Sequence, residues 1–593
     1  MKILNNIKFK ILIFVLSISM FGCKDSFLDL VNKDAISPAV FPTTVAQLDI
    51  ILASVYGEQH DWGFLGGAWH GYAMYPLDHT CDFQWRQDEG WLGESLGRAI
   101  LGWASGITEW RDISRGVYYA NSCLEAIETY RKTAPATEKQ QIDIRQGQAL
   151  FLRAFYWWHL QEMYGQPNLD GMGIPIIKSV PKDLVAMNVP RSSTLNSYQA
   201  MINDFKKAAD LLVGQTDVHR ATVWSAKAAL ARTYMFAAKL DSAKIYLEDC
   251  INNSGKTLVP FSSYKNMFNG NSTYEYNSES FYEVGNKAEP DKTNGNGARQ
   301  ANTGSTITLL YTPIYVYSDG TRKAMGYSNL YMHDRNLTRF GYNDLPMLKV
   351  VEQVNGVWKL KDSYVAQQKD RRNLVGTQAD GPDPRLYVCG LQPMVDSVKI
   401  AGVYYKVGMT EFGNWWTLDP TTNLDPATFY GWALKKNQYL DGTLAETMNI
   451  AGANFYFIRL PDIYLLYAEI IKSTNPTLAL EYINKVHRRA YSYDPNAVSP
   501  VDYKSLTDRT KTAADDHLAN NPLLYERWAE FFGEGRWWED VRRFKIGGNE
   551  ASFYKTVAAG RVITWRDENY AMPLPPLEFE SNGDPGMKQN PGY

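Results

Sequence analysis

Helical periodicity is concentrated near the two ends of this 593-residue chain and fades between residues 255 and 452. Apolar residues recur three and four positions apart behind Thr44, a residue type that favours the start of a helix. We therefore predict two helical blocks that fold together, with the middle region packed on one face. The ranges with this spacing are 45–55, 107–130, 138–164, 197–213, 222–239, 242–252, 461–472, 477–491, 522–532 and 537–544.

The expected fold class is mainly α, and the chain is too long for a single small core. Short, Ala-rich helix pairs around residues 222–252 resemble tetratricopeptide units, although no strict 34-residue period is present. Residues 397–407 read as short strands or a hairpin within a loop-rich insert. The predicted divisions are a signal peptide at 1–22, helical blocks at 23–254 and 453–593, and the insert at 255–452. The last twenty residues are expected to form an irregular, Pro-rich tail.

The N-terminus has the organisation of a bacterial lipoprotein signal. A basic head is followed by an apolar run over residues 11–21, too short to span a bilayer, and then by Gly22-Cys23. We predict lipidation at Cys23, so that the protein sits on a membrane without crossing it; an ordinary signal peptide with a coincidental Cys is the alternative. Two disulfides are possible, but buried free thiols are the preferred interpretation of the other cysteines. These are Cys81, Cys123, Cys250 and Cys389.

Residues 61–110 hold six of the 17 Trp residues among Gly and charged residues, without regular periodicity. Aromatic rings can stack on the C–H faces of sugars while nearby polar groups bond the hydroxyls. We therefore predict that residues 61–106 of this segment form a loop and that this loop carries an oligosaccharide site. The candidate ligand-binding residues here are Trp62, Trp69, Trp85, Arg86, Trp91 and Trp103, whereas Trp110, Trp157, Trp158, Trp224, Trp528, Trp537 and Trp538 are assigned to helix packing.

The insert offers a second group of aromatic candidates. Trp415 and Trp416 stand beside Asn414 in a predicted turn, and adjacent residues of an extended segment point to opposite sides. At most one of this pair is therefore expected to face a ligand. The group also includes Tyr311, Tyr315, Tyr317, Tyr327, Trp358 and Trp432.

The charged residues do not indicate a metal site, a catalytic site or a nucleic-acid interface. His79, Cys81 and Asp82 do not complete a metal site, and no CxxC or HExxH motif accompanies them. Asp88, Glu89 and Glu94 could supply a hydrolase carboxylate pair, but no feature singles them out. The charge cluster at residues 526–543 lies at helical spacing and is interpreted as exposed ion pairs between packed helices. Lys and Arg number 61 against 64 Asp and Glu, which gives no electrostatic basis for binding nucleic acid.

Several blocks resemble, in order, the SusD/RagB family of outer-membrane lipoproteins, and together they span nearly the whole mature chain. The departures from the family pattern are small. His487 stands where the family often has Arg, and the tail has Met-Pro-Leu-Pro in place of the commoner Pro-Ile-Pro. The matching blocks are SFLD (26–29), TTVAQLDIILASVY (43–56), RQGQALFLRAFYWWHLQEMYGQPNL (145–169), RATVWSAKAALARTYMFA (220–237), FYFIRLPDIYLLYAEI (455–470), ALEYINKVHRRA (479–490), LLYERWAEFFGEGRWWEDVRRF (523–544), MPLPPLEFE (572–580) and QNPGY (589–593).

This resemblance implies a tetratricopeptide-like helical scaffold with an irregular, variable face. It also implies a non-enzymatic protein that captures oligosaccharides at the cell surface and delivers them to a SusC-like TonB-dependent transporter, without a cofactor. In the family pattern, Asp82 falls where an acidic residue begins the ligand-facing loop. A peptide-binding partner of a peptide-importing transporter is the alternative, because a helical-repeat groove also suits extended peptides.

Overall fold

The computed structural model describes a helical scaffold together with parts of the insert. The described residues are 41–61, 63–65, 81–83, 104–287, 314–316, 322–324, 330–332, 334–343, 347–373, 381–400, 403–407, 432–438, 452–555 and 565–593.

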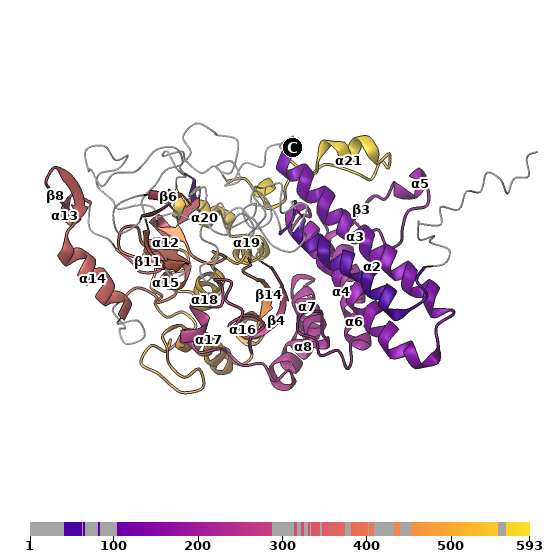
Figure 1. The fold of residues 1–593 in the computed structure, drawn as a ribbon, viewed down its shortest axis with the longest axis horizontal. Coiled ribbons are helices and arrows are strands. Elements are labelled where there is room, and N and C mark those ends of the chain that lie inside the picture. Colours follow the sequence, from indigo (N-terminus) through magenta and orange to yellow (C-terminus); the bar gives the residue numbers. More distant parts are fainter. Residues whose placement is uncertain are drawn as a thin grey trace, which may run out of the picture.

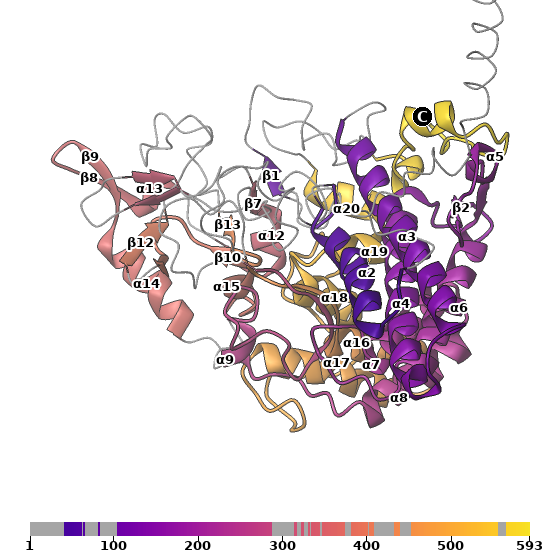
Figure 2. The same cartoon turned by 45° about the vertical axis from the view of Figure 1, so that its right-hand side comes forward.

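The long N-terminal helices pack in chain order: α3 against α4, α4 against α6, α6 against α7 and α7 against α8, while α2 lies against α3 and α4 (Figures 1 and 2). Their starts follow the expected capping chemistry. The backbone N–H of Gln47 donates to the Thr44 side chain, and Thr222 and Ser225 form a reciprocal capping box. The bounds are α2 Val45–Gly57, α3 Ala104–Arg131, α4 Lys139–Tyr164, α6 Thr194–Leu211, α7 Val223–Phe236 and α8 Leu240–Asn253, with the short η2 Glu58–His60, η4 Ala136–Glu138 and α5 Leu184–Met187.

Helix α4 is the centre of this block. Every residue from Gly147 to Tyr164 is buried, including polar Arg153 and Glu162. The spacing of its apolar residues predicts that only one side of this helix is buried. The structure buries all sides of the stretch 147–164, and α2, α3 and α6 all pack against the helix.

The C-terminal block closes onto the N-terminal one. Helix α16 packs against α7 and α8, and the strand before it, β14, pairs antiparallel with β4. The expectation that the two helical blocks fold together is met by these contacts. The bounds are β4 Ser280–Val284, β14 Phe455–Arg459, α16 Leu460–Ile471, α17 Pro476–Ala490, α18 Pro522–Phe531, α19 Trp537–Phe544, α20 Gly547–Tyr554, η6 Asp567–Tyr570 and α21 Pro576–Ser581. Helix α21 shows that the predicted irregular tail was wrong in part.

The described parts of the insert form small sheets and short helices. The predicted hairpin at residues 397–407 is confirmed as β11 and β12, whereas α14 was not predicted because it has little apolar periodicity. The four-stranded sheets have the orders β1-β7-β13-β10 and β11-β12-β5-β6. The strands are β1 Cys81–Phe83, β2 Met172–Pro175, β3 Arg191–Ser193, β5 Ile314–Val316, β6 Arg322–Ala324, β7 Leu330–Met332, β8 Val351–Val354, β9 Val357–Leu360, β10 Gly390–Leu391, β11 Ser397–Ile400, β12 Val403–Val407 and β13 Ala433–Leu434, and the helices are α9 Phe261–Tyr264, α12 Asp334–Arg339, α13 Met347–Val350, α14 Asp362–Asn373 and α15 Leu386–Cys389.

The cysteines and the helix lengths bear on the compartment predicted for the chain. Cys123, Cys250 and Cys389 are buried free thiols, as expected. Among the described residues, no helix combines the length and the apolar character that crossing a membrane requires.

Candidate functional site

Most of the predicted ligand-binding residues lie outside the described residues. This holds for Trp62, Trp69, Trp85, Arg86, Trp91, Trp103, Trp415 and Trp416, and also for the predicted lipidation site Cys23. Asp82 lies in β1, where it is the register partner of Tyr331 in β7. The Trp-rich segment and the insert therefore share a sheet, which places residues 81–83 of the predicted loop beside strand β7 of the insert.

The entry to the Trp-rich segment is tied to α3. Arg115 donates to Glu58 (2.8 Å) and pairs with Asp61, while the backbone N–H of Gly63 donates to Asp112 Oδ2 (2.8 Å). Phe64 then enters the core with its ring 4.8 Å from that of His159, in a T-shaped contact. The first residues of the segment thus anchor it, and α3 already begins at residue 104.

Burial changes the protonation of this anchor. It raises the pKa of Glu58 to about 7, and the neighbouring Arg115 only partly opposes the shift. The Arg115 guanidinium keeps its charge throughout the physiological range. The contact between residues 58 and 115 therefore loses its ion-pair character as pH falls below about 7.

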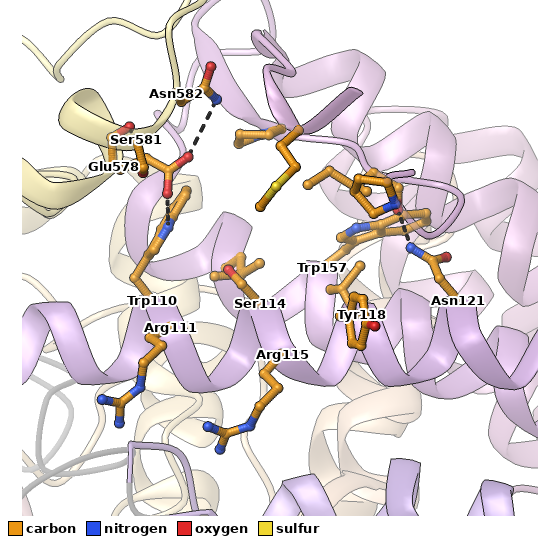
Figure 3. Close-up of a pocket in the computed structure, with 16 residues that line it drawn as sticks. Trp110, Arg111, Ser114, Arg115, Tyr118, Asn121, Trp157, Glu578, Ser581 and Asn582 are labelled. Carbon is orange, nitrogen blue, oxygen red and sulfur yellow. Dashed lines mark hydrogen bonds between the residues drawn. The ribbon is translucent and has the colours of Figure 1, made fainter. Parts of the chain in front are cut away.

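An apolar cleft of about 360 Å³ lies between α3, residues 175–187 and α21. In Figure 3 the guanidinium groups of Arg111 and Arg115 point away from it. Trp110 donates through Nε1 to Glu578 at 2.8 Å, which fastens α21 to α3 (Figure 3). Most of its lining surface is apolar, so the cleft can accept apolar groups. Its uncharged polar lining residues are Ser114, Tyr118, Asn121, Ser581 and Asn582.

The helical Trp residues pack as predicted. Trp110, Trp157, Trp158, Trp528, Trp537 and Trp538 are buried, and Trp224 is half-buried against the core with Lys227 over its ring. In the insert, Trp432 is fully buried between Tyr342 and Tyr387, so its inclusion among the ligand candidates was wrong. Trp358 is half-buried in β9 and packs against the small core around Val350. Trp432 therefore supports the fold and is not available to a ligand.

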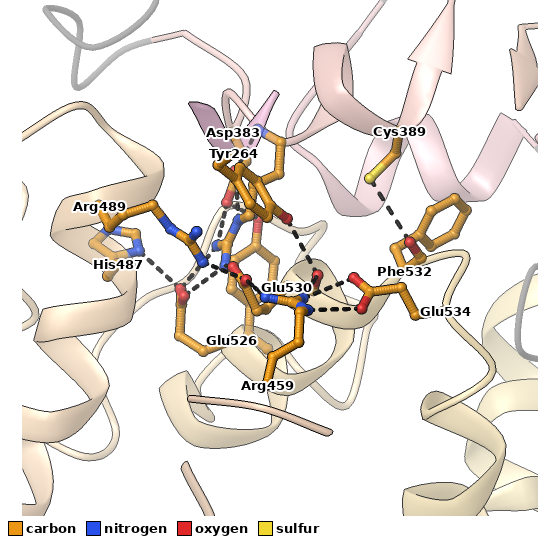
Figure 4. A network of polar contacts seen from close by, with 12 residues as sticks. Tyr264, Asp383, Cys389, Arg459, His487, Arg489, Glu526, Glu530, Phe532 and Glu534 are labelled. Atoms are coloured by element: carbon orange, nitrogen blue, oxygen red, sulfur yellow. Dashed lines mark hydrogen bonds and ion pairs between the residues drawn. The ribbon is translucent and has the colours of Figure 1, made fainter. Parts of the chain in front are cut away.

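The charge cluster at residues 526–543 is structural but buried, which corrects the prediction of exposed ion pairs. Arg459 pairs with Glu279, Glu530 and Glu534 at 2.7–2.9 Å, and none of these four side chains is more than 4% exposed. Figure 4 shows Arg459 beside Glu530 and Glu534. A second group in the same network is His487, Arg385, Asp383 and Glu526 (Figure 4). Sequence spacing placed Glu526 and Glu530 on a helix but could not show that each faces opposite charge across the core.

A second, polar pocket of about 450 Å³ lies where α2 and β4 end. It collects side chains from five separate stretches of sequence, so no local pattern announces it. Its lining residues are Ala53, Tyr56, Gly57, Gln59, His60, His219, Arg220, Glu275, Tyr276, Tyr282, Glu283, Gly285, Asn286, Lys287 and Asn454.

Comparisons with known proteins agree over nearly the whole chain. A family model described as "Starch-binding associating with outer membrane" matches residues 27–235, and the SusD family model matches residues 264–593. A "SusD-like protein" of Bacteroides ovatus is 24% identical over 284 residues, which cover 44% of this chain and 47% of that protein.

Solved structures share the fold. A SusD-like protein from Bacteroides fragilis superposes with a TM-score of 0.64 at 19% identity, covering 93% of this chain and 98% of that one. The surface glycan-binding protein A of Bacteroides thetaiotaomicron, solved in complex with laminarihexaose, gives 0.59 at 16% identity, covering 92% of this chain and 99% of that one. At these identities the structural likeness establishes the architecture alone.

Proposed function

The chain belongs to the SusD/RagB family, and on that premise we propose that it is a non-enzymatic, surface-exposed glycan-binding lipoprotein of the outer membrane. It captures oligosaccharides and delivers them to a SusC-like TonB-dependent transporter, with Cys23 as its lipid anchor. The observation that carries the proposal is that two family models together cover residues 27–235 and 264–593. A structural relative of the same fold binds laminarihexaose.

In the proposed site, the Trp-rich loop supplies the stacking surfaces. The rings of Trp85 and Trp91 cover the C–H faces of sugar units, while Arg86 and Asp82 bond hydroxyl groups. Trp62, Trp69, Trp103, Trp415 and Trp416 are the further candidates. The pairing of β1 with β7 supports this arrangement, because it joins the loop and the insert in a single sheet.

Affinity gel electrophoresis against a panel of polysaccharides, with laminarin included, tests glycan binding. Retardation by at least one polysaccharide is expected, and the double variant Trp85→Ala/Trp91→Ala should lose it. Trp224→Ala is the matched control, because this Trp is half-buried on the scaffold helix α7. Full retardation of the double variant would refute the assigned loop, and retention of peptides in place of any polysaccharide would refute the ligand class.

Delivery to a transporter and lipid anchoring are tested in cells. Metabolic labelling with a palmitate analogue should mark the wild-type protein and not Cys23→Ala. The wild-type protein should also co-purify with a TonB-dependent transporter from detergent-solubilised outer membranes. Equal labelling of both proteins would refute the anchor, and recovery of the protein without any such transporter would refute the delivery role.

A further inference from the structure

The polar pocket at the ends of α2 and β4 holds buried polar atoms without a hydrogen-bond partner among the described residues. Glu283 is 3% exposed, and its Oε1 finds no hydrogen-bond partner in the described part of the chain. The same is true of Glu275 Oε1, Asn286 Oδ1 and Arg220 Nη1. Buried polar atoms usually have partners, and each unpaired one costs about 1–3 kcal/mol. These four atoms belong to residues that line one hollow, which points to a ligand that completes the site.

The side chains of this pocket are held in place by their other contacts. Asn454 donates to Glu283 Oε2 (2.9 Å) and accepts from the backbone N–H of Asn286 (2.8 Å). Asn286 in turn donates its amide N–H to the carbonyl of Ala453 (2.6 Å). The guanidinium of Arg220 lies 4.6 Å from the centre of the Tyr56 ring. The unpaired atoms are therefore oriented before any ligand arrives, which lowers the entropic cost of binding.

The lining chemistry favours a neutral ligand rich in hydroxyl groups. The lining combines two acidic side chains, Glu275 and Glu283, with two basic ones, Arg220 and Lys287, so neither residue type dominates. The unpaired atoms include acceptors and a donor, and a hydroxyl group can serve both. The ring of Tyr276, which stands 4.4 Å from that of His219, adds an aromatic wall. The volume of about 450 Å³ also falls within the usual range of about 300–1,000 Å³ for small-molecule sites.

We propose that this pocket is a second saccharide site, separate from the Trp-rich loop, that binds one sugar unit through Glu283, Glu275, Asn286 and Arg220. The choice of a saccharide over other hydroxylated molecules rests on the proposed function. The pocket lies where η2 ends at His60 and where the chain leaves β4 at Gly285, and His60 directly precedes the Trp-rich segment that begins at residue 61. A sugar unit held here would lie at the base of the face assigned to ligand binding.

The electrostatics of the pocket are consistent with this role. Burial, together with the nearby Glu283, raises the pKa of Glu275 to about 7, against a hydrogen bond with the backbone of Asn454. Burial likewise raises the pKa of Glu283, against the hydrogen bond from Asn454. Hydroxyl donors from a sugar would stabilise the charged carboxylates and offset part of this cost.

Saturation-transfer NMR tests the proposal in the Trp85→Ala/Trp91→Ala background, where the loop site is removed. The probes are methyl glucoside, methyl mannoside, xylose and N-acetylglucosamine, each offered alone. Ala53→Trp fills the pocket from the exposed side of α2, since Ala53 lines the pocket and is exposed. Ser54→Trp is the matched control, because Ser54 is the next exposed residue on that helix and does not line the pocket.

At least one probe should give saturation transfer that Ala53→Trp abolishes and Ser54→Trp preserves. Glu283→Gln should weaken the affinity for that probe about tenfold or more, because a charged hydrogen bond is lost. Equal signals from the Ala53→Trp and Ser54→Trp proteins would overturn the proposal. So would stabilisation by calcium chloride that Glu283→Gln abolishes, in the absence of any sugar signal, because the free oxygens would then serve a cation.

Failure of this inference can be told apart from failure of the proposed function. Polysaccharide retardation that depends on the loop, together with no signal that depends on the pocket, would refute the second site and leave the proposed function standing. A pocket-dependent sugar signal without retardation by any polysaccharide would support the second site and refute capture by the loop.

Discussion

Arg459→Met should destabilise the protein strongly, because Arg459 is the shared partner of three buried carboxylates. It donates to Glu279 and Glu530 through Nη1 and to Glu534 through Nη2 and Nε. The exposed fractions of these glutamates are 0%, 0% and 4%, so water cannot replace the lost charge. Methionine keeps much of the apolar length of arginine, and the lost interaction is therefore mainly electrostatic.

The expected loss in the free energy of unfolding depends on which buried carboxylates keep a cationic partner in Arg459→Met. Removing one member of a buried ion pair usually costs about 3–5 kcal/mol, since the partner remains buried and uncompensated. Arg489 still pairs with Glu279 and Glu530, and Lys436 with Glu534 at 2.7 Å, so complete loss of the fold is not expected. We therefore expect a loss of about 3–5 kcal/mol in the free energy of unfolding.

Urea unfolding followed by Trp fluorescence measures this loss. Arg145→Met is the matched control, because Arg145 pairs with Asp49, which is 43% exposed and can be hydrated again; its cost should stay below about 1 kcal/mol. The double variant Arg459→Met/Glu534→Gln should recover part of the stability by removing one uncompensated charge. Equal unfolding midpoints for Arg459→Met and Arg145→Met would refute the reasoning.

Three further predictions follow from burial and capping. The folded wild type holds the Glu58 proton more tightly than the unfolded chain does, so its stability should fall by on the order of 1–2 kcal/mol as pH rises from 4.5 to about 7. Glu58→Gln should remove this decrease. Urea midpoints across that pH range measure the difference, and parallel curves for the two proteins would contradict the prediction. Burial raises the pKa of Cys123 to about 12, so DTNB should label it quickly only after unfolding, and rapid labelling of the native protein would contradict this. Thr222→Ala should cost about 1 kcal/mol through loss of the capping box at α7, and an unchanged urea midpoint would contradict it.

The helices were predictable because their signals are local. Thr44 caps α2 as expected, and the periodic run that ends before Gly165 is α4. Helix α14 was missed because its sequence is polar along most of its length. Its position depends on neighbouring insert residues, which periodicity does not record.

The charged residues show the limit of spacing arguments more clearly. Helical spacing placed Glu526 and Glu530 on one helix, but it could not reveal that Arg385, 141 positions before Glu526, lies across from them. Exposure was therefore assigned wrongly to residues that are fully buried. The polar pocket escaped for the same reason, because Glu283 and Asn454 meet only through the pairing of β4 with β14.

The anchoring of the Trp-rich segment bears on how a ligand loop of this size could bind. At the start of the segment, Asp61 pairs with Arg115 of α3, and Gly63 donates its backbone N–H to Asp112 of the same helix. The segment ends where α3 begins, at residue 104. Both ends are therefore fixed to one rigid element, so the entropy of closing the loop is lost on folding and not on binding. Because Asp112 and Arg115 hold the entry without lining the polar pocket, changes there should alter loop binding while leaving the pocket intact.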